Sequence, residues 1–191
     1  GALATTLQRN FRTLSSAPTS GTVFFRYDIS ASGIESSLAN DEVLGLALFT
    51  GTGTEHAFFG IRNDFFRLNV NGDTAYDSAA STGGDGEYTL LLELTFNDSG
   101  ANESLRGIVV DDVNSFDESN SIMISNTPAT NFTFDTVRIV KNGADFTGSY
   151  DNLIIGSTLA DVGIMAIPEP ETFALLAGFG SLCMIAFRRR K

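Results

Sequence analysis

The densest group of side chains with metal-binding chemistry lies in one short stretch of the sequence. Asp111 and Asp112 are followed within seven residues by Asp117 and Glu118. Carboxylate oxygens from a flexible loop suit Ca²⁺, so these four residues form a candidate calcium site. Their spacing is not that of an EF-hand, and the alternative interpretation is a solvated strand end followed by a loop. We expect no other cofactor.

Residues suited to catalysis are few. The chain has one cysteine, Cys183, and one histidine, His56, so an internal disulfide, a cysteine-based zinc site and most nucleophile–histidine arrangements lack support. Glu87 and Glu93 share one expected strand, but their six-residue separation extends over about 20 Å. A glycosidase holds its two carboxylates about 5 to 10 Å apart. We therefore predict that the protein is not an enzyme.

Aromatic residues that could stack on a sugar ring are also scarce. The chain has no tryptophan, which leaves Tyr76 and Tyr150 as the candidate ligand-binding residues. Tyr76 follows an Asn71-Gly72 pair, which is a strong hairpin-turn signal because both residues tolerate positive φ. The alternative interpretation is that each tyrosine packs in a strand.

The C-terminal tail has three consecutive parts. Pro168-Glu169-Pro170 is an extended acidic segment, because proline excludes it from a helix. Residues 172–187 carry no charge and would span roughly 24 Å as a helix, so we predict a single membrane span. The alternative is a buried C-terminal helix of a soluble domain. The basic residues that follow favour the span, because they are a positive-inside stop signal: Arg188, Arg189, Arg190 and Lys191.

This order of parts over residues 168–191 resembles the PEP-CTERM sorting signal of surface proteins in Gram-negative bacteria that make exopolysaccharide. The resemblance implies that an exosortase, an integral-membrane cysteine transpeptidase, recognises the tail and cleaves it at or near the motif. Pro168, Glu169 and Pro170 would then be a substrate motif. Arg188 to Lys191 would hold the precursor in the inner membrane until processing.

The basic residues are unevenly distributed along the chain. The whole chain has a formal net charge of -11, with 12 basic and 23 acidic residues, and four of the basic residues are the last four. The body before them therefore has a net charge of −15. Phosphate backbones would repel such a body, so we exclude nucleic acid as a partner.

The body shows a strand pattern throughout. Short runs of β-branched and aromatic residues alternate with polar ones and are separated by Gly, Asn, Asp and Ser, with no sustained helical period. Without helices to connect parallel strands, we predict an antiparallel β-sandwich filled largely by phenylalanine. The expected strands are 22–30, 43–50, 56–61, 64–70, 74–77, 87–96, 104–113, 121–125, 132–140 and 150–155.

The body also resembles concanavalin A-like or laminin-G-like jelly rolls. The residues that carry this resemblance are 22–27, 88–94 and a recurring aromatic-Asp-x-aliphatic-x-Ile pattern at 134–139 and 150–155. Glucanases of similar fold have a Glu-x-Asp-x-x-Glu strand motif, which this chain lacks. The resemblance therefore implies a fold and no activity.

These observations give four segments. We expect a lead-in at 1–21 that is mobile or briefly helical near 7–14, a sandwich domain at 22–160, a linker at 161–167 and the sorting tail at 168–191. Export also requires a signal peptide, and residues 1–4 show neither its basic start nor its long apolar segment.

The function that we predict is that of an exported, non-enzymatic cell-surface or extracellular-matrix protein, associated with biofilm exopolysaccharide. Its partners would be the exosortase, the inner membrane before processing, and extracellular polysaccharide. Two alternatives stay open: a carbohydrate-binding, lectin-like module that uses Ca²⁺, and a glycoside hydrolase.

Overall fold

The structure is a computed structural model. No helix in the described part of the chain is long and apolar enough to span a membrane. The predicted hairpin turn at Asn71-Gly72, the sorting motif, the predicted span and the basic end all lie outside the described residues. The structure describes residues 2–3, 8–16, 18–34, 42–51, 53–70, 76–77, 83–97, 102–128, 131–143 and 146–166.

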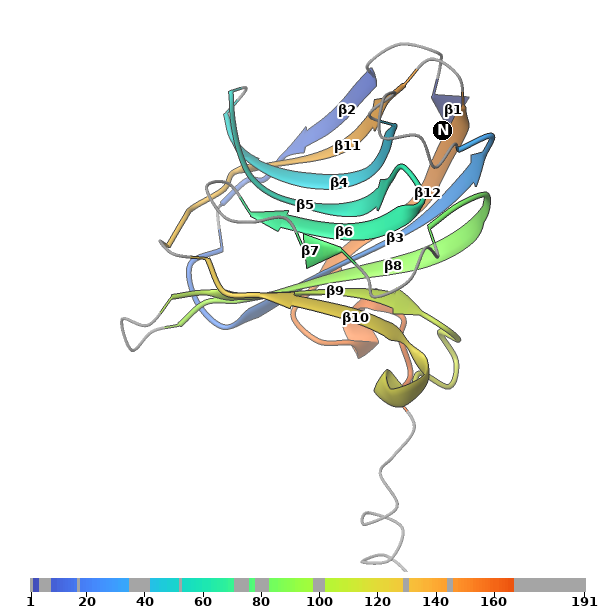
Figure 1. The fold of residues 1–191 in the computed structure, drawn as a ribbon. Coiled ribbons are helices and arrows are strands. Elements are labelled where there is room, and N and C mark those ends of the chain that lie inside the picture. The colour runs from blue at the N-terminus through green and yellow to red at the C-terminus, as the bar shows by residue number, and fades with distance from the viewer. Residues whose placement is uncertain are drawn as a thin grey trace, which may run out of the picture.

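Within the described residues, twelve strands form two six-stranded antiparallel sheets (Figure 1), so the prediction of an all-β antiparallel sandwich is confirmed. In order across it, sheet A contains β1 (Ala2–Leu3), β12 (Thr147–Gly156), β3 (Thr22–Ser32), β8 (Gly86–Thr95), β9 (Ser104–Val110) and β10 (Ile122–Asn126). Sheet B contains β2 (Gln8–Thr13), β11 (Thr136–Asn142), β4 (Val43–Thr50), β5 (Thr54–Arg62), β6 (Phe65–Val70) and β7 (Tyr76–Asp77).

The main core lies between the sheets and follows from the alternation of each strand. In β3, Phe25, Tyr27 and Ile29 are buried in this core, which places Arg26 and Asp28 on the outer face of sheet A. The Tyr27 hydroxyl donates a hydrogen bond of 2.5 Å to the Phe59 carbonyl oxygen of sheet B. Burial strongly raises the pKa of Tyr27, so this phenol stays protonated.

Adjacent phenylalanines divide between the two faces of a strand. Phe25 and Phe59 lie in the main core, whereas Phe24 and Phe58 contact separate apolar clusters. Phe58 packs with Ala47 and Phe49 on the other face of sheet B. Paired phenylalanines therefore do not all enter the core, because successive side chains of a strand point to opposite faces of the sheet.

The N-terminal lead-in differs from its prediction. Gln8–Thr13 is strand β2, which pairs with β11 from Gln8↔Lys141 to Thr13↔Thr136, and the shorter β1 pairs with β12. The expectation of a mobile or helical segment near residues 7–14 was wrong. The reason is that β11 offers a full row of backbone donors and acceptors, and a mostly polar segment satisfies them as well as an apolar one does.

The predicted linker at 161–167 also differs. After β12 the chain continues through η2 (Ala160–Val162) and lies against the outer face of sheet A. We call residues 157–166 the C-terminal strap. Val162 and Ile164 of the strap are 0% and 1% exposed. Residues up to 166 therefore belong to the folded domain, because burial of these two side chains offsets the cost of ordering the segment.

Candidate functional site

The acidic residues of the predicted calcium site form local contacts. Asp112 accepts hydrogen bonds of 2.8 Å from the Asn114 backbone nitrogen and from the Ser115 hydroxyl, and these contacts lower its pKa. Asp117 accepts a bond of 2.8 Å from the Ser119 backbone nitrogen at the start of η1 (Glu118–Asn120), and its pKa is lowered too. These hydrogen bonds hold the two carboxylates against the backbone of their own loop.

The remaining two residues of that site have other partners. Glu118 pairs with Arg106 at 2.7 Å, and Arg106 also pairs with Glu93 at 3.2 Å. Asp111 accepts a hydrogen bond of 3.3 Å from the Ser121 hydroxyl. Within the described ranges, no three His, Cys, Asp or Glu residues are grouped so that they could hold a metal ion. The calcium site therefore stays a prediction.

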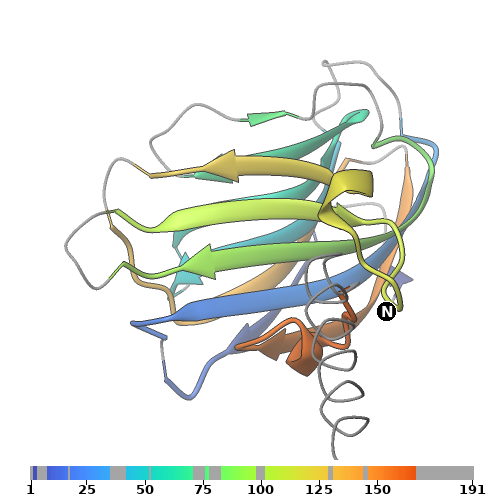
Figure 2. The same ribbon diagram turned by 90° about the horizontal axis from the view of Figure 1, so that it is seen from below.

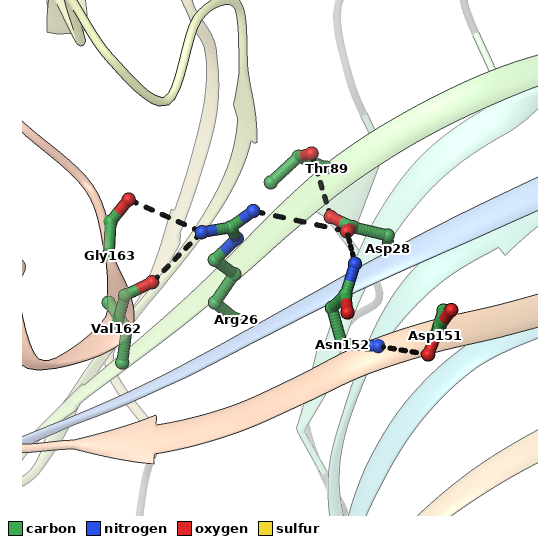
Figure 3. A network of polar contacts seen from close by, with 7 residues as sticks. All are labelled: Arg26, Asp28, Thr89, Asp151, Asn152, Val162 and Gly163. Atoms are coloured by element: carbon green, nitrogen blue, oxygen red, sulfur yellow. Dashed lines mark hydrogen bonds and ion pairs between the residues drawn. The ribbon is translucent and has the colours of Figure 1, made fainter.

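A polar network connects three strands on the outer face of sheet A (Figure 3). Asp28 of β3 accepts hydrogen bonds from the Thr89 hydroxyl of β8 at 2.8 Å and from the Asn152 side-chain nitrogen of β12 at 2.7 Å. Arg26 approaches the same carboxylate at 3.9 Å. Asn152 has φ of +52° at an irregularity in β12, and this left-handed conformation is one that asparagine tolerates.

The network borders a shallow hollow of about 380 Å³. Strand register explains its chemistry, because Asp28 lies opposite Asp151 and Thr89, and Ser30 lies opposite Ser149 and Glu87. Three neighbouring strands thus present carboxylates and hydroxyls together, which suits a ligand rich in hydroxyl groups. The residues that line the hollow are Asp28, Ile29, Ser30, Glu87, Tyr88, Thr89, Ser149, Tyr150 and Asp151.

The structure separates the two candidate tyrosines. Tyr150 lies in β12 of sheet A, lines the hollow and packs partly against the main core. Tyr76 lies in β7, which belongs to sheet B. Sequence reasoning missed Asp28, Thr89 and Asn152, whose only signal was polar positions within strands.

The C-terminal strap is fixed beside this network. The Asp161 carboxylate accepts hydrogen bonds from the backbone nitrogens of Ser157 and Thr158 and from the Ser157 hydroxyl. Hydrogen bonds from Thr158 and Ser157 lower the pKa of Asp161, which keeps it ionised. Gly163 follows with φ of +70°, in the left-handed conformation that glycine adopts without strain.

Sheet A holds the strap through side chains and backbone. Arg26 of β3 donates from Nη1 to the carbonyl oxygens of Val162 and Gly163, at 3.1 and 3.2 Å (Figure 3). Val162 and Ile164 pack in an apolar cluster with Leu91, Ile108, Val110 and Phe116. Complete burial of one such side chain contributes about 1.5 to 3 kcal/mol. The strap is therefore a stable part of the domain.

Comparison with known proteins identifies the tail. Residues 166–191 match the family model of the PEP-CTERM protein-sorting motif. Fold and motif together define the class: an extracellular β-sandwich protein that is sorted by an exosortase. More particularly, the chain carries a PEP-CTERM tail, which implies export and anchoring in the membrane before processing.

The body is similar to solved structures at low identity. The globular domain of T. cruzi calreticulin matches with 10% identity and a TM-score of 0.48, over 84% of this chain and 73% of that chain. Scytalido-glutamic peptidase, solved with a transition state analog inhibitor, matches with 11% identity and a TM-score of 0.46, over 84% and 86%. The search of curated proteins gives no match.

Proposed function

We propose that the protein is a non-enzymatic component of the cell surface or extracellular matrix of a Gram-negative bacterium, where it associates with biofilm exopolysaccharide. The observation that carries this proposal is the match of the whole tail, residues 166–191, to the PEP-CTERM family model, because this tail follows directly on a folded β-sandwich. The exosortase is the processing partner. The β-sandwich is the domain that is exported and sorted by means of the tail.

The charge of the body supports a place in a polysaccharide matrix. Once the tail and its four basic residues are removed, the remaining acidic body can associate with matrix cations and stays soluble through self-repulsion. The described acidic side chains of the loop at 111–118 are exposed or half-buried, so they are accessible to such ions.

Processing of the tail is tested by changing the sorting motif. Pro168→Ala and Glu169→Ala are each expected to block cleavage, so that precursor accumulates, because both remove a feature of the extended acidic segment. Intact mass of the secreted protein is the measurement, and the wild-type product is expected to end near Pro170. Glu171→Gln, which changes the neighbouring acid outside the motif, is the matched control and should be processed normally.

Two results would overturn the processing step. The first is secreted wild-type protein whose mass still includes Arg190 and Lys191. The second is normal processing of both motif variants. Release of reducing sugar from polysaccharides by the purified mature protein would instead contradict the non-enzymatic role and favour a glycoside hydrolase.

A second candidate function is carbohydrate binding, and the hollow on sheet A favours it. Its carboxylates and hydroxyls can bond sugar hydroxyls. The secreted mature protein is expected to bind members of a glycan array. Glu87→Gln should weaken that binding about tenfold, since a hydrogen bond to a charged group contributes about 1.5 to 3 kcal/mol.

Calcium dependence separates the hollow from the acidic loop. The array is read with Ca²⁺ and with a chelator, and Asp112→Asn in the loop is the matched control for Glu87→Gln in the hollow. Loss of binding in Asp112→Asn alone would move the site to the loop, and loss of wild-type binding in the presence of the chelator would show that the site depends on Ca²⁺. Equal binding by wild type and both variants would contradict a role for either region.

A further inference from the structure

The C-terminal strap ends immediately before the sorting motif. Its last described residue is Ala166, which forms a parallel bridge with Phe116, and the motif begins two residues later at Pro168. In Figure 2 the strap, with η2, lies against sheet A beside β3 and β12. The sequence therefore leaves Ile167 alone between the folded domain and the motif.

Chain length then limits how far the motif can lie from the sandwich. Consecutive residues extend at most about 3.6 Å each, so Pro168 lies within about 7 Å of Ala166. Six such steps reach Thr172, where the predicted span begins, so the whole connection is at most about 22 Å. While the strap is docked, the domain must sit close to the membrane surface.

The backbone just before the motif is already hydrogen-bonded. Met165 donates its N–H to the Val113 carbonyl and accepts a bond from the Phe116 N–H, each at 2.8 Å. The Met165 side chain is nevertheless 58% exposed. An enzyme that binds an extended peptide as an added strand pairs with the backbone of that peptide, and in the docked strap both backbone groups of Met165 are already occupied.

We propose that the docked strap hinders access of the exosortase to the sorting motif, and that release of residues 157–166 from sheet A precedes cleavage. The inference rests on processing by the exosortase and concerns the step that sets its rate. The bonds that must open join Arg26 to Val162 and Gly163, and Phe116 and Val113 to Met165. The apolar contacts of Val162 and Ile164 must separate as well.

Two kinds of variant loosen this arrangement by independent routes. Ile164→Ser weakens docking of the strap, whereas a six-residue Gly/Ser insertion between Ala166 and Ile167 leaves the strap docked and moves the motif away. In a strain that contains the exosortase, each full-length precursor should be processed at least about threefold faster than wild type, because a larger fraction is competent for the enzyme. Pulse-chase labelling of precursor and product measures the rate.

A disulfide that keeps the strap docked should slow processing of the precursor. Phe116→Cys with Ala166→Cys, in a Cys183→Ser background, places two cysteines on bridge partners, and neighbouring strands lie about 4.8 Å apart, within the range for a disulfide. The oxidised precursor should be processed at least about tenfold more slowly than the same precursor after reduction. The reduced form is the control for both substitutions.

The outcomes distinguish the strap from the processing itself. The inference would be overturned if the spacer variant were processed no faster than wild type. It would also be overturned if the oxidised and reduced precursors were processed at equal rates. Both results would hold even if Ile164→Ser failed to fold. Slower processing of the spacer variant would overturn it too, since the strap would then present the motif. If wild type and every variant remained uncleaved, exosortase processing would be contradicted and the inference with it.

Discussion

Replacing Gly60 by valine is expected to lower the free energy of unfolding by at least about 3 kcal/mol, which is the upper range for an overpacked site. Gly60 in β5 lies directly opposite Gly45 in β4. A Cβ atom at Gly60 would lie 2.5 Å from the Gly45 Cα and closer still to the Leu44 carbonyl oxygen. Both obstacles are backbone atoms of a central strand, so they cannot rotate away.

Chemical denaturation with a matched glycine tests this expectation. Gly84→Ala is the control, because a Cβ there meets no atom within 4 Å. It should change the midpoint little, while Gly60→Val should lower it strongly or prevent folding. Gly60→Ala, which adds a single carbon, should fall between them. A Gly60→Val protein as stable as the Gly84→Ala control would show that β4 and β5 do not approach this closely.

The second large effect is expected in the core between the sheets, where Gly107→Ala should cost about 1 to 3 kcal/mol. Gly107 of β9 faces the ring of Phe59 from β5. A Cβ there would lie 2.9 Å from the Phe59 Cζ and closer to two other ring atoms. Phe59 is fully buried, so its ring has no solvent-filled space to enter.

A double-mutant cycle isolates this contact. Phe59→Leu alone removes buried volume, and in that background Gly107→Ala should cost less or become stabilising, because the added methyl occupies vacated space. The coupling between the two sites should be at least about 1 kcal/mol, which is typical for residues in contact. Additive effects in the cycle would show that sheets A and B do not meet at this pair.

Much of the sandwich could be predicted because its strands have a clear apolar pattern. Val43–Thr50 was predicted to the residue, and β3 is longer than expected only at its C-terminal end. Gln8–Thr13 could not be recognised, since Phe11 is its only apolar residue and its partner β11 lies more than a hundred residues away. The strap has the same difficulty, because two buried residues, Val162 and Ile164, give no period.

Less of the candidate site could be predicted from the sequence. Tyr150 was selected for its aromatic ring; it borders the hollow, but its side chain packs partly against the main core, so its role in ligand binding stays a prediction. Asp28, however, meets Thr89 and Asn152 across separations of 61 and 124 residues. The order of strands in sheet A creates this neighbourhood, and no local pattern of charges or spacing indicates it. The acidic loop was visible in the sequence, but its hydrogen bonds and its ion pair with Arg106 were not.

The order of strands also has a consequence for when the protein can fold. In sheet A, β12 lies between β1 and β3, and in sheet B, β11 lies between β2 and β4. The last two strands of the described residues therefore occupy interior positions and join the N-terminal strands to the rest. Neither sheet can be completed until residues 136–156 have paired with these N-terminal strands. Pairing of such distant segments is intrinsically slow, so both sheets are completed by contacts between the two ends of the folded domain, and this closure is expected to be the slow step of folding.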